Sequence, residues 1–220
     1  MPVFESKAGT HFVISSYKVM YSTLASQETL RELSWCCSGR LLLRKFIKKR
    51  HASTFQLVRN PYDRVRSLFS DKFRKEPRRI HKPEFYWQGC HQVLFPYLDL
   101  TGAASDNEKA EAFLNFSFAD FLKLLPAVWT KEAHYHPQHF STALRWRGRY
   151  WPVRWPVTHV FRMETDLPAF AERTRVDIGT RRNPAPPSPE CNTWTPEMRR
   201  IVNSLYRRDF QHYHYEQADA

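Results

Sequence analysis

A strand that runs directly into a capped helix constrains the fold of this chain more than any other feature. Thr54–Val58 is a short apolar segment, and Arg59-Asn60-Pro61 follows it at once. Asn60 is a favourable N-cap, and Pro61 suits the first position of a helix. The sequence therefore predicts a buried strand, a tight turn and a helix. Its apolar face consists of Tyr62, Val65, Leu68, Phe69 and Phe73.

Strand-like and helix-like segments alternate along the rest of the chain. From Thr10 onwards, apolar residues at helical spacing favour a helix, although their β-branched and aromatic content suits a strand as well. We predict further strands at Pro2–Phe4 and Val157–Phe161, and loops at 131–155 and 181–188. Further helices are predicted at Glu28–Cys37, Leu41–Lys49, Phe118–Leu125, Asp166–Arg175 and from Pro196 onwards. This alternation predicts one α/β domain over 1–220, a parallel sheet flanked by helices, with an irregular insertion or lid at 74–115.

The balance of charges narrows the classes of partner. Lysine and arginine number 34 against 22 acidic residues, a net charge of +12, which favours anionic ligands. Hydrophobic residues make up 42% of the chain, which excludes disorder as its main state. The four cysteines form no CxxC pair, so a structural zinc site has little support and no metal is expected. No signal peptide or apolar run of about 20 residues is present, so a cytoplasmic location without a membrane span is expected.

The turn after Thr54–Val58 has the chemistry of an anion site. Free N–H groups and the helix dipole at a strand-to-helix turn favour a phosphate. Arg59 is able to bind that phosphate in a bidentate manner, and Ser67 is able to donate a further hydrogen bond. Arg64 lies on the same polar face of the helix. The alternative is an ordinary surface helix with solvated arginines.

The same segment resembles a known cofactor motif, the 3′-phosphate-binding motif of sulfotransferases that use 3′-phosphoadenosine-5′-phosphosulfate. The resemblance is to the family-2, carbohydrate type, whose motif runs R-[DN]-P-[FY]-x-R-x-x-S-x-[YF]-x-x-K-F. The matching residues are Arg59, Asn60, Pro61, Tyr62, Arg64, Ser67, Phe69, Lys72 and Phe73. Other stretches resemble family segments in the same order: Phe116–Leu122, His134–Gln138, Val160–Thr165 and Leu205–Tyr213.

This resemblance implies a P-loop-like sulfotransferase fold and a set of site residues. Arg59 and Ser67 would hold the 3′-phosphate together with Arg64, and Arg181 and Arg182 would return to it from a late loop. The loop for the 5′-phosphosulfate is expected at Lys7, Ala8, Gly9 and Thr10, and Lys7 would assist departure of the bridging oxygen. A rival position at Ser22–Thr29 has no lysine. His134 and His136 rank first as the base for the acceptor hydroxyl, followed by His11 and Glu164.

The resulting hypothesis is a sulfotransferase that acts on a hydroxyl of a carbohydrate or another small acceptor. An arginine- and tryptophan-rich run suits a sugar or an acidic acceptor. Its members are Arg145, Arg147, Arg149, Arg154, Trp146, Trp151 and Trp155. The alternatives are a degenerate relative that binds nucleotide or an acidic ligand without transfer and, with less support, a nucleic-acid-binding module. A kinase is disfavoured because no GxxxxGK[ST] sequence is present.

Overall fold

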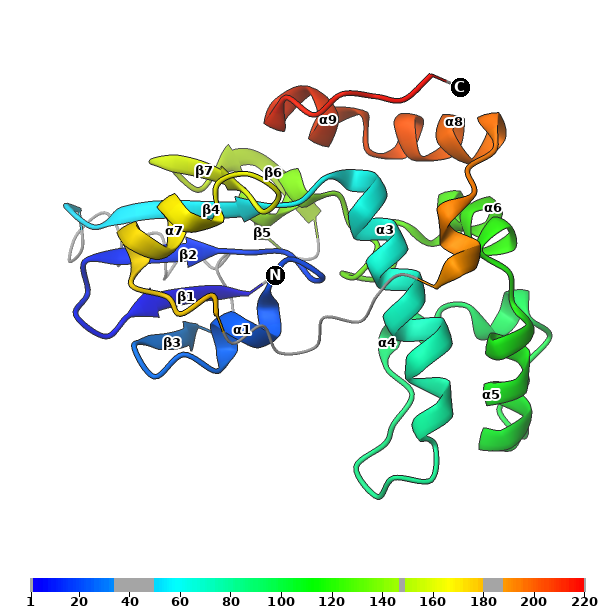
Figure 1. Ribbon diagram of the computed structural model, residues 1–220. Coiled ribbons are helices and arrows are strands. Elements are labelled where there is room, and N and C mark those ends of the chain that lie inside the picture. Colours follow the sequence, from blue (N-terminus) through cyan, green and yellow to red (C-terminus); the bar gives the residue numbers. More distant parts are fainter. Residues whose placement is uncertain (1, 34–49, 147–148, 180–187, 220) are drawn as a thin grey trace. The chain divides into compact units, whose positions relative to one another are not determined.

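The structure is a computed structural model, and it describes residues 2–33, 50–146, 149–179 and 188–219. It divides the chain into two compact units, and Figure 1 labels their α-helices and β-strands. Unit 1 comprises Met1–Asn60, Pro137–Pro184 and Gln211–Tyr215. Unit 2 comprises Pro61–His136, Ala185–Phe210 and Glu216–Ala220. The predicted helix Leu41–Lys49 lies outside the described residues.

Unit 1 contains a mixed, five-stranded sheet in the order β3-β1-β2-β4-β7. Its strands are β1 (Val3–Ser6), β2 (His11–Ile14), β3 (Leu30–Leu33), β4 (Ser53–Val58) and β7 (His159–Arg162). β2, β4 and β7 run parallel, whereas β1 is antiparallel to both β2 and β3. The α/β class is confirmed, and the expectation of a parallel sheet holds only for these three strands.

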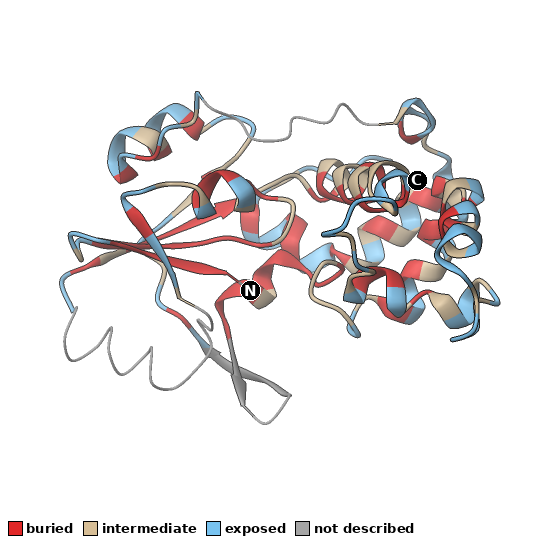
Figure 2. Cartoon of the chain, turned by 90° about the horizontal axis from the view of Figure 1, so that it is seen from below, coloured by how far each residue is buried: buried red, intermediate tan, exposed pale blue. Residues whose placement is uncertain are grey.

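Both faces of this sheet are buried, and Figure 2 shows its central strands coloured as buried. One face packs against α1 (Tyr21–Ala25) and α7 (Leu167–Thr174) through a cluster that includes Phe4, Phe55 and Phe161. The other face carries Phe12 and Ile14 against Trp155. Unit 1 also contains η4 (Gln138–Thr142) and a hairpin of β5 (Ala143–Trp146) and β6 (Arg149–Arg154), where a loop was predicted.

Two helix predictions in unit 1 are wrong. The segment from Thr10 forms strand β2 and then the short helix α1, because β2 pairs with β1 on one side and β4 on the other. Leu30–Leu33 is a strand because it pairs with β1. In both segments long-range pairing outweighs a local apolar spacing that also fits a helix.

Unit 2 is helical. Its elements are α3 (Pro61–Phe69), the π-helix η1 (Ser70–Lys75), η2 (Pro77–Arg79), α4 (Gly89–Gln92), η3 (Phe95–Tyr97), α5 (Asp106–Asn115), α6 (Phe118–Val128), η5 (Pro189–Asn192) and α8 (Pro196–Leu205). The helix α9 (Arg207–Tyr213) begins in unit 2, and its last residues belong to unit 1. An aromatic cluster around Phe73, Phe113 and Phe121 forms the core.

The predicted helices after Pro61, Ser117 and Thr195 are confirmed, as is the predicted helix at α7. Ser117 accepts a hydrogen bond from Asp120 N, and Thr195 accepts one from Met198 N. Side-chain caps of this kind satisfy backbone N–H groups that the first turn of a helix leaves without partners. Because this chemistry is local, Ser117 and Thr195 marked these helix starts in the sequence.

Candidate functional site

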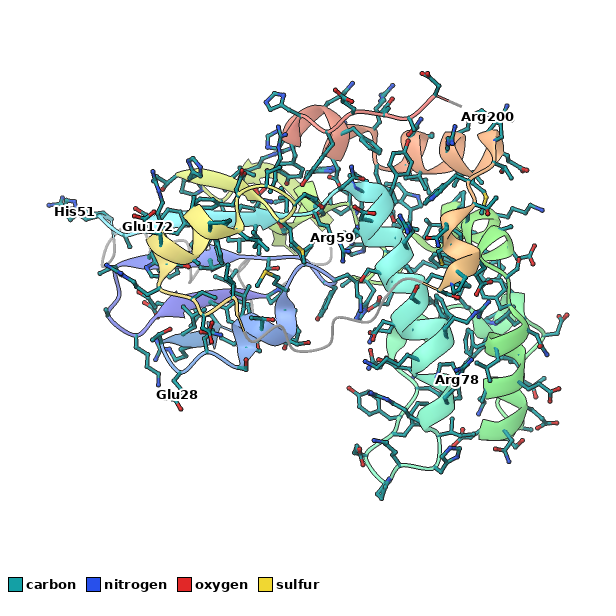
Figure 3. The ribbon with its side chains drawn as sticks, in the orientation of Figure 1. Glu28, His51, Arg59, Arg78, Glu172 and Arg200 are labelled. Atoms are coloured by element: carbon teal, nitrogen blue, oxygen red, sulfur yellow. The ribbon has the colours of Figure 1, made fainter. Side chains whose placement is uncertain are left out.

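The three parallel strands of unit 1 end at one edge of the sheet. β2 ends at Ile14, β4 at Val58 and β7 at Arg162. Figure 3 shows Arg59 beyond this end of β4 and His51 beyond the other end. Ligands of open α/β sheets bind beyond the carboxyl ends of parallel strands. We call the residues Ser16, Lys18 and Arg59, with their supports Gln138 and Glu164, the carboxyl-edge site.

The loop between β2 and α1 supplies Ser16 and Lys18. Lys18 and Met20 adopt left-handed backbone conformations, with φ of 70° and 53°. Such conformations are strained for residues other than glycine, and they cluster at functional sites. The loop is held in shape because Ser15 Oγ donates to Val19 O and Val19 N donates to Ser16 O. Ser16 is only 1% exposed, and its hydroxyl has no hydrogen-bond partner among the described residues.

Arg59 joins this loop to the end of β4. Its Nη1 donates to Lys18 O at 3.3 Å, so the guanidinium lies beside the loop that carries Lys18. The backbone of Arg59 is fixed from both sides by one buried side chain, Gln138. Arg59 N donates to Gln138 Oε1 at 2.8 Å, and Gln138 Nε2 donates to Arg59 O at 2.6 Å. This pair of bonds sets the direction in which the Arg59 side chain leaves the strand.

Glu164 supports the same turn from the end of β7. Asn60 N donates to Glu164 Oε1, and the Tyr215 hydroxyl donates to Glu164 Oε2, both at 2.8 Å. Burial and this bond to a carboxylate raise the pKa of Tyr215, so its hydroxyl remains a donor. The guanidinium of Arg162 lies over the Tyr215 ring, 5.3 Å from its centroid. Glu164, predicted as a reserve candidate for the base, is therefore bonded on both oxygens and holds the turn.

The geometry of unit 1 argues against the expected phosphosulfate loop at Lys7, Ala8, Gly9 and Thr10. These residues form the tight turn of the antiparallel β1–β2 hairpin, and no helix follows them. The backbone N–H groups of Lys7, Gly9 and Thr10, which a phosphate would require, are already bonded within the unit. Lys7 N donates to Thr29 O and Gly9 N to Ser6 O, while Thr10 N and His11 N both donate to Ser6 Oγ.

This hairpin also lies at the wrong edge of the sheet. Thr10 O accepts from Ser53 N, the first residue of β4, whereas Arg59 follows its last residue. At a rise of about 3.3 Å per residue, roughly 20 Å of strand separates Ser53 from Arg59. The 3′- and 5′-phosphates of one nucleotide are attached to the same ribose, only a few bonds apart. The hairpin and Arg59 therefore cannot form the two halves of one nucleotide site.

His11, the other reserve candidate for the base, begins β2 at this same amino edge. It is 8% exposed, and burial lowers its pKa. Its Nδ1 lies 3.1 Å from Thr10 Oγ1, and its ring packs 5.7 Å from that of Phe55. His11 is thus a largely buried strand residue, well away from Arg59.

Arg64, predicted to bind the cofactor, has a structural position in unit 2 instead. It is 1% exposed, and its Nη2 donates to His134 O at 3.0 Å and to His136 O at 2.6 Å. Its guanidinium also lies over the Tyr206 ring. A buried cation whose donors bind backbone carbonyls holds the chain together, so the structure gives Arg64 a structural role. Ser67 lies on α3 in the same unit and is half-buried.

The two histidines predicted as bases differ in their surroundings within unit 2. His136 is 5% exposed, and its Nε2 lies 3.1 Å from Thr130 O, which makes it a buried structural residue. His134 Nδ1 lies 2.9 Å from Glu132 Oε2. Burial alone would raise the pKa of Glu132, but the bonds and charge of His134 outweigh it and lower that pKa. A carboxylate that orients an imidazole is typical of general bases, so His134 stays a candidate.

The remaining predicted residues fall outside the described part or serve the core. Arg181 and Arg182 lie outside the described residues, as do the side chains of Arg145, Arg147 and Arg149. Trp155, from the predicted acceptor surface, is 3% exposed and packs edge-on against Phe12. Its indole N–H donates to Thr54 Oγ1, so Trp155 is a core residue.

Sequence reasoning missed Lys18 as a site residue. A signal was present, because Lys18 stands between the apolar segment that forms β2 and the hydroxyl residues Ser22 and Thr23. The predicted helix from Thr10 concealed it by placing Lys18 inside a regular element. The positioning role of Gln138 had no local signal, because Gln138 binds a residue 79 positions away.

In the described ranges, no three His, Cys, Asp or Glu side chains gather in a way that could hold a metal ion. No described helix has the length and apolar character needed to cross a bilayer. Comparisons with protein-family models, curated proteins and solved structures found no match to this chain.

Proposed function

We propose that the carboxyl-edge site binds 3′-phosphoadenosine-5′-phosphosulfate and that the chain is a sulfotransferase acting on a hydroxyl of a carbohydrate or another small acceptor. The observation that carries this proposal is the contact between Arg59 and the Lys18 loop. It places the Arg59 guanidinium against the backbone of the loop that carries Lys18, beyond neighbouring parallel strands, where α/β proteins bind phosphorylated ligands.

The donor set fits a nucleotide with two phosphorylated positions. Arg59 offers a planar guanidinium suited to a phosphate, and Lys18 offers a compact charge for a second group. The buried Ser16 hydroxyl, which lacks a partner among the described residues, is a further donor in the same loop. Lys18 takes the role that the family resemblance first suggested for Lys7. Its loop follows a strand and precedes a helix, as the family's 5′-phosphosulfate loop does.

Sulfuryl transfer requires few groups from the protein. The acceptor oxygen forms a bond to sulfur while the bond from sulfur to the bridging phosphate oxygen breaks. The hydroxyl proton passes to a base, and negative charge grows on the leaving phosphate. Lys18 would neutralise that charge, and Arg59 would hold the nucleotide.

Calorimetry with 3′-phosphoadenosine 5′-phosphate tests the binding step. Wild-type protein is expected to bind the nucleotide in low salt, and Arg59→Ala is expected to lose most of that affinity. Lys7→Ala is the matched control, because it removes a lysine from the opposite edge of the same sheet. No binding by wild-type protein in low salt would refute the proposal.

A second candidate, a relative that binds the nucleotide without transferring sulfate, rests on the buried position of His136 and on Glu164 being bonded on both oxygens. Both contacts occupy groups that the reaction would need as a base. Transfer of labelled sulfate to a panel of glycans, lipids and phenols separates the two functions. Binding without transfer to any acceptor would favour the second.

A further inference from the structure

Unit 2 carries a basic groove made of residues that the nucleotide proposal does not use. The groove has a volume of about 510 Å³ and lies where η1, η2 and the start of η5 meet. Its lining consists of Ser70, Arg74, Lys75, Arg78, Arg79, Ser188 and Pro189. Four of these side chains are cationic, and none is acidic. One wall is a π-helix, a rare element that frequently marks functional sites.

Arg74 builds the groove rather than supplying charge to it. Its Nη1 donates to Phe113 O at 2.8 Å and its Nη2 to Phe116 O at 2.7 Å. The same guanidinium pairs with Glu190, whose pKa it lowers through that hydrogen bond. Ser188 N donates to Ser70 Oγ at 2.9 Å, which ties the opposite wall to η1. The shape of the groove is therefore fixed by internal bonds.

Arg78 and Arg79 supply the open positive charge. Both are exposed, and within the described ranges neither side chain has a hydrogen-bond or ion-pair partner; Figure 3 labels Arg78. Two guanidinium groups that line one concave surface suit a tetrahedral oxyanion, because each presents paired donors to oxygen.

A smaller pocket of about 120 Å³ adjoins the groove and shares Arg79 with it. Tyr86 and Lys82 line this pocket together with Glu76 and Glu84, and Tyr86 is 69% exposed. Glu76 accepts a hydrogen bond from Lys72 Nζ, which offsets its charge. An exposed aromatic face beside a cation suits a ring that carries a negative group. A ligand lying across both hollows would place its oxyanion at Arg79 and its ring at Tyr86.

We propose that this groove binds small ring-bearing molecules that carry a sulfate or phosphate ester, with Arg78 and Arg79 holding the oxyanion and Tyr86 contacting the ring. Surfaces for single-stranded nucleic acid present successive aromatic side chains for stacking. Among the described residues only Tyr86 and Tyr97 are large apolar side chains that stand exposed, which favours a small ligand.

The test is a titration of the full, ¹⁵N-labelled chain with glucose 6-phosphate, glucose 6-sulfate and glucose, followed by NMR. We expect saturable shifts of the side-chain N–H signals of Arg78 and Arg79 with at least one ester and none with glucose. The two esters distinguish a phosphate ligand from a sulfate ligand. The double variant Arg78→Gln/Arg79→Gln is expected to weaken ester binding about tenfold or more.

The pair Arg207→Gln/Arg208→Gln is the matched control, because it removes two adjacent exposed arginines from α9. This control is expected to leave ester binding unchanged. Tyr86→Ala is expected to weaken binding a few-fold, because it removes the ring contact but no charge. An equal loss in the control, or no saturable binding of either ester in low salt, would overturn the proposal. Tight binding of a single-stranded oligonucleotide that Arg78→Gln/Arg79→Gln abolishes, with no ester binding, would replace it.

The groove and the carboxyl-edge site are separable by variants. Arg59→Ala is expected to leave ester binding unchanged, and Arg78→Gln/Arg79→Gln is expected to leave binding of 3′-phosphoadenosine 5′-phosphate unchanged. Loss of ester binding in Arg59→Ala would show that the ester occupies the nucleotide site, and it would overturn the second site alone.

Discussion

The two edges of the unit 1 sheet carry similar residues but differ in their ability to bind an anion. The amino edge holds Lys7, Gly9 and Thr10 in a hairpin, and the carboxyl edge holds Ser16 and Lys18 in a loop beside Arg59. In the sequence, the amino-edge segment is the better match to a phosphate loop. In the structure, the N–H groups of Gly9 and Thr10 are bonded to Ser6 in the same hairpin, and that of Lys7 is bonded to Thr29 O.

The difference shows what an anion site requires beyond its residue types. A hairpin satisfies its own backbone donors, since antiparallel strands and their turn pair with each other. A loop at the end of parallel strands instead gathers side chains from several strands at one place. Arg59 and Lys18 come together in this way, although 41 positions separate them in the chain. The following predictions test whether nucleotide binding and sulfuryl transfer depend on the carboxyl edge and not on the amino edge.

The largest effect is expected for Lys18→Ala on sulfuryl transfer. Removing the cation that neutralises the leaving phosphate is expected to lower kcat about 10²- to 10³-fold, the cost typical of losing one charge-stabilising group. The measurement is transfer of labelled sulfate under saturating nucleotide. Lys7→Ala is expected to stay within about twofold of wild type on the same scale. A larger loss of kcat in Lys7→Ala than in Lys18→Ala would place the reaction at the amino edge.

Arg59→Ala is expected to weaken binding of 3′-phosphoadenosine 5′-phosphate about 100-fold, because two charge-assisted hydrogen bonds are lost. Arg59→Lys is expected to recover part of the affinity, because it restores the charge without the paired donors. Calorimetry measures both, and thermal melting of each variant shows whether the fold is intact. Full affinity in a folded Arg59→Ala protein would contradict the site.

Gln138→Ala is expected to weaken nucleotide binding about tenfold and to lower Tm by several degrees, because it leaves buried backbone groups of Arg59 without partners. Gln27→Ala is a control in the same unit, since Gln27 also bonds to backbone but lies near Asp177. The control is expected to keep its nucleotide affinity. A lower Tm in Gln138→Ala with unchanged nucleotide affinity would mean that the hydrogen bonds between Gln138 and Arg59 serve stability alone.

The smallest effect concerns His11 and the pH dependence of stability. Burial lowers the pKa of folded His11, so below about pH 6.5 the unfolded chain binds more protons at this residue than the folded chain. Stability is therefore lost as the pH falls below that value. His11→Gln is expected to reduce this loss in melts between pH 7.5 and 5 without changing nucleotide affinity at pH 7.5. A nucleotide affinity that depends on His11 would bring the amino edge back into the site.

The elements that could be predicted from the sequence are those with local signals. Pro61, Ser117 and Thr195 mark helix starts through chemistry confined to a few neighbouring residues. β4 was predictable because its apolar residues stand directly before the helix start at Pro61. The position of Arg59 was predictable for the same reason, since it stands at the junction of two locally marked elements.

The rest depends on partners far along the chain. The strands β2 and β3 have only four residues each, and their pairing with β1 decides their conformation. The burial of Arg64 depends on carbonyls at positions 134 and 136. No local pattern contains this information, so an exposed arginine on a polar helix face was expected there instead.

The most direct test of the central claim is an NMR titration of the ¹⁵N-labelled chain with 3′-phosphoadenosine 5′-phosphate, followed through the backbone amides of unit 1. We expect the largest shifts at 15–20 and 58–60, with 7–11 nearly unchanged. Shifts concentrated at 7–11, with 15–20 and 58–60 silent, would contradict the account and return the nucleotide to the amino edge.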